Sequence, residues 1–165
     1  MDRKDWIQLF NGKNLDGCAP KITGYPLGEN HADTFRVANG MLQASYDKYA
    51  RFEDKFGHLF YDRQKFSHYI IAAEYRFVGE QVAGGPDWAI RNNGLMLHSQ
   101  SPQSMGKDQD FPISVEVQLL GGLPNGKPRS TAPYPRIADG VHTMAFIEAC
   151  VASNANNGQW TRVVA

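Results

Sequence analysis

The sequence predicts an all-β protein, a jelly-roll sandwich built from two antiparallel sheets. Sixteen glycines and nine prolines divide the 165 residues into short apolar stretches. No stretch keeps the apolar period of about 3.6 residues that marks an amphipathic helix. Many short strands separated by turn signals are typical of sandwiches and jelly rolls. The length suits one domain, so we expect residues 1–165 to form a single domain.

Short strands are expected within the first 61 residues, at 34–37, 41–44 and 57–61. The dipeptide Asn39-Gly40 between the first two is a strong hairpin signal, because both residues tolerate the left-handed backbone of a tight turn. Residues 46–56 mix aromatic and charged side chains, which fits a short helix or an irregular loop equally well.

Longer strands are expected at 67–77, 93–99 and 113–120, where β-branched and aromatic residues gather between turn residues. A further strand is expected at 143–148. The segment 121–135 contains four prolines and is predicted to cross the surface as a long loop.

The charge balance excludes several classes of function. Seventeen basic residues match seventeen acidic ones, so there is no electrostatic footprint for nucleic acid or for an anionic membrane. No apolar run reaches membrane-spanning length, and the first residues do not read as a secretory signal. Cys18 and Cys150 have no zinc-ligand spacing; two free thiols are favoured, although one disulfide stays open.

Strand alternation at 113–120 places Glu116 and Gln118 on one face, opposite Val115 and Val117. Residues two apart on a strand are about 6.5–7 Å apart, so the carboxylate of Glu116 and the amide of Gln118 can bind neighbouring atoms of one small ligand. A solvated outer face is the competing interpretation.

The same alternation groups Glu74 with Arg76 at 67–77, and it points His98 away from the leucines of 93–99. Glu74 and Arg76 by themselves fit a structural ion pair. A histidine is an acid or base near neutral pH, but a lone one is more often an ordinary hydrogen-bonding residue.

Motifs for phosphate loops, dinucleotide binding, serine nucleophiles and zinc proteases are missing from the sequence. Cofactor-driven redox chemistry and phosphoryl transfer are therefore unsupported. Aromatic residues in or near expected loops suit the faces of sugars, and they equally suit the interior of a sandwich.

Five stretches resemble the DUF1080 family, described as 3-keto-disaccharide hydrolase domains. In order, they are 7–17 (IQLFNGKNLDG), 57–61 (GHLFY), 66–77 (FSHYIIAAEYRF), 92–98 (NNGLMLH) and 115–120 (VEVQLL). The resemblance implies a concanavalin A-like jelly roll with a sugar cleft on its concave sheet. Members usually continue beyond Gln159-Trp160, which implies missing C-terminal strands, and relatives are often periplasmic or secreted.

The resemblance also implies a site and a reaction. Its polar cleft positions correspond to Glu74, Asn93, His98, Glu116 and Gln118. The implied reaction cleaves 3-keto-glycosides, with Glu116 and His98 as the catalytic residues. Glu116 is the base, His98, Asn93 and Gln118 position the sugar or stabilise the enolate, and Glu74 with Arg76 orients them. A divalent metal ion is compatible with this chemistry, but no ligand set stands out.

Two other functions stay open. The same kind of sandwich serves non-catalytic, lectin-like carbohydrate-binding modules, because a fold does not dictate a function. The chain can also be a fragment that forms a homo-oligomer through an exposed strand edge.

Overall fold

The computed structural model describes residues 6–122 and residue 155. The chain divides into two compact units, residues 1–127 and residues 128–165, and residues 6–122 belong to the first unit. The expected single domain over 1–165 stays a prediction. The expected strand at 143–148 and most of the expected loop at 121–135 lie outside the described residues.

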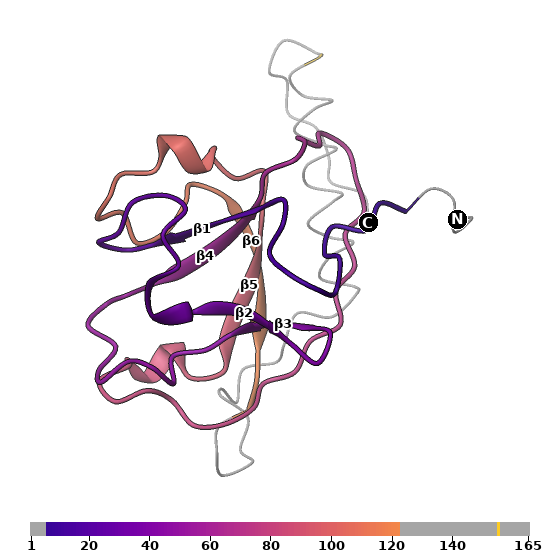
Figure 1. Ribbon diagram of the computed structural model, residues 1–165. Helices are drawn as coiled ribbons and strands as arrows, with labels where there is room; N and C mark the ends of the chain where they lie inside the picture. Colours follow the sequence, from indigo (N-terminus) through magenta and orange to yellow (C-terminus); the bar gives the residue numbers. More distant parts are fainter. Residues whose placement is uncertain (1–5, 123–154, 156–165) are drawn as a thin grey trace. The chain divides into compact units, whose positions relative to one another are not determined.

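Residues 6–122 form an all-β structure of antiparallel strand pairs, which confirms the predicted fold class and is consistent with a jelly roll (Figure 1). The pairs are β1 with β4, β2 with β3, and β5 with β6. Short 3-10 helices interrupt the connections. The elements in order are β1 (Cys18–Ile22), η2 (His31–Asp33), β2 (Phe35–Ala38), β3 (Met41–Ala44), β4 (Gly57–Tyr61), η3 (Asp87–Ala89), β5 (Asn92–Leu97), η4 (Pro102–Ser104) and β6 (Val115–Leu120).

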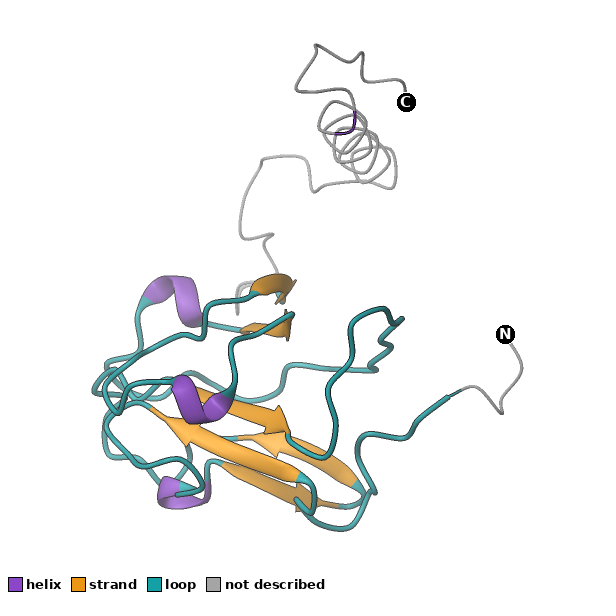
Figure 2. Ribbon diagram, turned by 90° about the horizontal axis from the view of Figure 1, so that it is seen from above, coloured by secondary structure: helices purple, strands orange, loops and turns teal. Residues whose placement is uncertain are grey.

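The strands lie in two layers. Figure 2 shows the strands of the β1–β4 and β2–β3 pairs in one layer and the β5–β6 pair in another. Loops join the two layers at their ends, and the chain enters β5 through η3 and connects β5 to β6 through η4.

The hairpin of β2 and β3 confirms the turn predicted from Asn39-Gly40. Both turn residues have positive φ, 52° at Asn39 and 74° at Gly40. Such a turn matches the right-handed twist of the strands that it joins. The predicted bounds of β3 and β4 are confirmed, and those of β2, β5 and β6 differ by at most two residues at either end.

β1 is a strand that the sequence pattern did not predict, because Pro20 lies at its centre. The carbonyl of Pro20 accepts a hydrogen bond from the amide of Gly28 at 2.8 Å. The backbone of Pro20 therefore faces away from the paired strand β4, on the side where a missing N–H costs no ladder bond.

The predicted strand at 67–77 is wrong. These residues have no strand ladder, and they run beside the β5–β6 pair as an extended loop that contacts it near both ends: the Tyr69 ring lies beside the His98 ring, and a Cβ on Gly121 would collide with the Phe77 ring. The composition favours a strand, but a strand also needs a hydrogen-bonded partner. Residues 46–56 contain turns and no helix.

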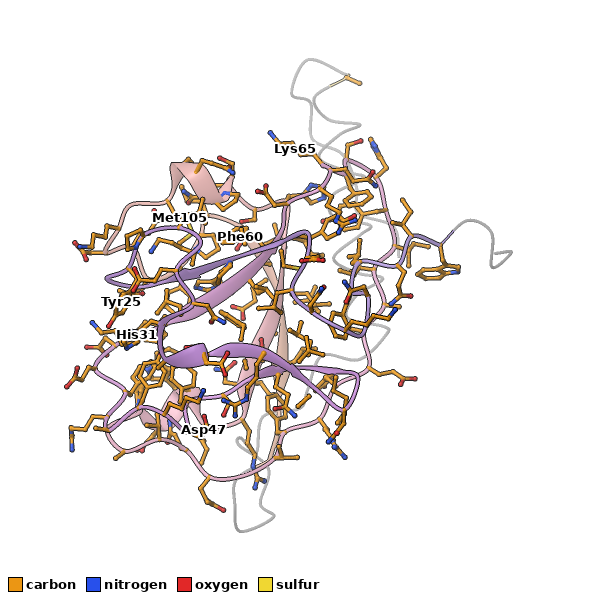
Figure 3. All side chains as sticks on the ribbon, in the orientation of Figure 1. Tyr25, His31, Asp47, Phe60, Lys65 and Met105 are labelled. Carbon is orange, nitrogen blue, oxygen red and sulfur yellow. The ribbon has the colours of Figure 1, made fainter. Side chains whose placement is uncertain are left out.

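A continuous series of aromatic rings connects the loops of residues 6–122, and Phe52 is its buried member. Consecutive ring centroids are 4.0–5.6 Å apart, and Figure 3 shows the labelled Tyr25 and His31 at the start of the series. Burial raises the pKa of the Tyr46 hydroxyl, which donates a hydrogen bond to the carbonyl of Lys55. The rings, in order of contact, are Tyr25, His31, Tyr49, Tyr46, Phe52 and Phe56, with Trp88 and Phe111 both packed on Phe56.

Two basic side chains, one buried and one half-buried, attach the loop before β6 to the β1–β4 pair. Lys21 is 2% exposed, and its ammonium donates to the carbonyls of Ile22 at 3.0 Å and Lys107 at 2.8 Å. His58 is directly opposite Lys21 in the strand register, and its Nε2 donates to the carbonyl of Asp110 at 2.7 Å. Removal from water lowers the pKa of both side chains.

We expect His58 to make folding stability fall as the pH is lowered through about 6.5. Burial, and secondarily the charge of Lys21, holds its folded-state pKa below the ordinary 6.5, against the opposing hydrogen bond to the Asp110 carbonyl. The unfolded chain therefore takes up the proton first, so the free energy of unfolding is fully present above that pH and decreases below it. Urea midpoints between pH 7.5 and 5 measure this.

The control is His58→Gln, whose amide can still donate to the Asp110 carbonyl but does not titrate. Its urea midpoint should change less with pH than that of the wild type. An equal pH dependence in both proteins would show that His58 is not the group responsible.

Candidate functional site

The face of the β5–β6 pair that carries Glu116 is the candidate site. The register sets Met96 opposite Glu116 and Gly94 opposite Gln118. Directly opposite residues of an antiparallel pair share a face. We call this surface the Glu116 face, and its members are Asn92, Gly94, Met96, Glu116, Gln118 and Leu120.

Two hydrogen bonds fix the amides of the Glu116 face. The Gln118 Nε2 donates to Asn92 Oδ1 at 3.2 Å, and the Asn92 Nδ2 donates to the carbonyl of Trp88 at 2.9 Å. The Trp88 carbonyl is an acceptor only, so it determines which end of the Asn92 amide points to Gln118. The Oε1 of Gln118 is therefore directed away from Asn92.

Gly94 makes room for the Glu116 side chain. A Cβ at Gly94 would collide with Cγ, Cδ and Oε1 of Glu116, so the carboxylate arm lies across the glycine. Glu116 and Gln118 are both exposed. A carboxylate and an amide side by side on an open strand face can bind hydroxyl groups and accept a proton from a bound ligand.

The shared face of Glu116 and Gln118 confirms the alternation predicted from the sequence. Asn93, in contrast, is opposite Leu119 on the other face, and its Oδ1 accepts a hydrogen bond from the Gly94 amide at 2.7 Å. The asparagine on the Glu116 face is Asn92, which the sequence prediction omits because it begins the strand one residue late. Counting back in steps of two from Met96 would have found it.

His98 follows the end of β5 at Leu97. Its φ of 47° is left-handed, which interrupts the alternation that predicted its direction. Its ring lies 5.4 Å from the ring of Tyr69, and its amide donates to the Tyr69 hydroxyl at 3.4 Å. Its predicted catalytic role stays a prediction.

Glu74 and Arg76 lie in the extended loop at 67–77 and are both exposed. The guanidinium of Arg76 contacts Sδ of Met41 on β3 at 3.7 Å. The salt bridges among residues 6–122 join Arg36 to Asp47 and Lys48 to Asp33, so Glu74 and Arg76 do not pair with each other. Their predicted orienting role stays a prediction.

Within 6–122, no three His, Cys, Asp or Glu side chains come together as a metal site would require. No helix among the same residues is long and apolar enough to cross a membrane. Cys18 carries a free thiol whose pKa burial raises, and Cys150 lies outside the described residues.

Antiparallel strand pairs with a carboxylate and amides on an open strand face define an all-β protein with a polar candidate site. The chain belongs to the family of 3-keto-alpha-glucoside-1,2-lyase-like domains, whose profile matches residues 5–164. This confirms the resemblance seen in the sequence and supports a carbohydrate-active function at the level of the family. No curated protein and no solved structure matched the chain.

We expect Gly94→Ala to destabilise the protein by displacing the Glu116 side chain. The new methyl group would occupy the space of the carboxylate arm. In the Glu116→Ala background the same change should cost less, which gives a coupling of about 0.5–1 kcal/mol in a double-mutant cycle of urea unfolding. Equal costs in the two backgrounds would contradict the contact.

Proposed function

We propose that this protein cleaves the glycosidic bond of 3-keto-glycosides, with Glu116 as the base. The observation that carries the proposal is the exposed Glu116 carboxylate beside the oriented amides of Gln118 and Asn92, in a chain of the 3-keto-alpha-glucoside-1,2-lyase-like family.

The proposed chemistry follows from the ketone at C3. A carbonyl at C3 acidifies the hydrogen on C2, so a carboxylate can remove that proton and leave an enolate. The electron pair then forms the C1–C2 double bond as the bond from C1 to the glycosidic oxygen breaks. The proton ends on the departing alcohol, and water can add to the unsaturated ketone afterwards to give the 3-keto-sugar. This differs from ordinary glycosidases, which use two carboxylates as acid and nucleophile or as acid and base.

The three polar side chains of the Glu116 face have different proposed parts. Glu116 takes the C2 proton. Gln118 and Asn92 hold the sugar hydroxyls, because each amide has both donor and acceptor capacity and the Trp88 carbonyl fixes their orientation. The Gln118 Nε2 carries a second hydrogen, which is available to stabilise the enolate oxygen.

We expect Glu116→Gln to lower kcat by about 10²–10⁴-fold, because the amide has a similar shape but is not a base. The measurement is release of the aglycone from a 3-keto-α-glucoside, on protein that circular dichroism shows to be folded, with added divalent cation or with EDTA. Glu29→Gln is the matched control, since Glu29 is an exposed glutamate far from β6 in sequence.

The outcomes separate the candidate functions. Unchanged turnover in Glu116→Gln would remove Glu116 from the mechanism. Saturable binding of sugars by the folded wild type without any turnover would instead support the lectin-like module.

A further inference from the structure

The extended loop at 67–77, which we call the strap, contacts the β5–β6 pair at both of its ends. At one end the Tyr69 hydroxyl accepts a hydrogen bond from the His98 amide at 3.4 Å. At the other end Cδ2 of Phe77 lies 2.8 Å from the position that a Cβ on Gly121 would occupy, so the ring fits there because Gly121 has no side chain. Between these two contacts the strap forms no ladder with β5.

The two contacts agree on one antiparallel register. Arg91 directly precedes β5, and its Cβ lies 2.8 Å from the same position at Gly121 as the Phe77 ring, so Phe77 lies beside Arg91. Counting from this pair along both segments brings Tyr69 to within one residue of His98, where the second contact lies. The strap therefore runs antiparallel to β5 along its whole length.

The backbone groups of β5 that do not pair with β6 point toward the strap. The Arg91 carbonyl accepts a hydrogen bond from the Gly121 amide at 2.8 Å, which continues the ladder between β5 and β6. Backbone direction alternates along an antiparallel strand, so the even-numbered residues of β5 direct their amides and carbonyls away from β6. The His98 amide, which donates to Tyr69, points the same way. On that edge β5 has no ladder partner among residues 6–122.

A neighbouring side chain occupies one of these edge groups. The Gly94 amide donates a hydrogen bond to Oδ1 of Asn93 at 2.7 Å, in the direction where a third strand would place a carbonyl. A side chain that binds the adjacent backbone in this way competes with a strand ladder. The strap itself has the composition of a strand, and its Ile70 and Tyr75 are 63% and 55% exposed. It therefore lacks only a hydrogen-bonded partner.

We propose that the strap closes on β5 as a third antiparallel strand, with Glu74 opposite Gly94, and that Asn93 favours the open state by occupying the Gly94 amide. Closing exchanges the bond to Asn93 for a ladder bond to the Glu74 carbonyl. Because opposite residues share a face, closing also carries the Glu74 side chain onto the Glu116 face. The candidate site thus has two states that differ by one carboxylate. This proposal does not depend on the lyase reaction.

Hydrogen exchange of the full chain, followed by NMR, tests the closing. The strap amides that point to β5 in the closed state are those of Ala72, Glu74 and Arg76. We expect Asn93→Val to slow the exchange of these amides by about fivefold to tenfold, because the open state loses a hydrogen bond, while the amides between them change little. Asn93→Asp is the matched control, since its carboxylate can still accept the Gly94 amide and should leave exchange near that of the wild type.

Cross-linking tests the register. The closed state places Ala73 opposite Leu95 in a pair whose backbone groups point away from each other, where side chains are closest. Cysteines are introduced at both positions by Ala73→Cys and Leu95→Cys, in a chain that also carries Cys18→Ser and Cys150→Ser. We expect this pair to form a disulfide in glutathione buffer at least about tenfold faster than Ala73→Cys with Met96→Cys, because Met96 lies on the other face of β5.

Three results would contradict the strap. Equal cross-linking of the two cysteine pairs would overturn the register, because it would mean that the strap moves freely beside β5. Exchange that does not alternate along the strap, or equal exchange in Asn93→Val and the wild type, would overturn the closing. Should Asn93→Val not fold, Asn93→Ala is measured in its place. If the strap fails these tests while Glu116→Gln still loses turnover, the proposed function stands and the strap alone is wrong.

Discussion

The packing of Trp88 and Phe111 on Phe56 is the contact on which the rest of the described structure depends. Phe56 directly precedes β4, Trp88 lies in η3 before β5, and Phe111 lies in the loop before β6. These three rings come from distant parts of the chain, so their contact joins the layer of β4 to the layer of β5 and β6. Aromatic pairs of this kind contribute roughly 0.5–1.5 kcal/mol each beyond their buried area.

A polar attachment reinforces the same connection. Lys21 and His58 lie on paired strands and donate hydrogen bonds to the carbonyls of Lys107 and Asp110, which shortly precede Phe111 in the sequence. Removing two ionisable side chains from water has a cost, which appears as their lowered pKa values. One attachment is apolar and the other contains the imidazole of His58, whose pKa burial lowers, so we expect acid to weaken the polar attachment only.

The Glu116 face depends on a small residue and on the backbone of Trp88, whose ring takes part in the aromatic packing. The Glu116 face needs a small residue beneath the carboxylate, and Gly94 provides it. It also needs amides of known orientation, and the backbone carbonyl of Trp88 provides that through Asn92. The residue that packs the layers together through its ring thus orients the polar site through its backbone.

The sequence by itself determined the features that depend on neighbouring residues. The Asn39-Gly40 turn requires only two residues that accept positive φ, and the shared face of Glu116 and Gln118 requires only strand alternation. Tertiary structure decided the features that depend on a distant partner. Residues 67–77 have the composition of a strand, but they form no strand ladder. Pro20 is accepted in β1 because its backbone faces away from β4. The left-handed backbone at His98 ends an alternation that the sequence alone would continue. Pairing, register and burial arise from contacts between segments far apart in the chain, which is why only the folded protein shows the buried Lys21 and its hydrogen bond to the Lys107 carbonyl.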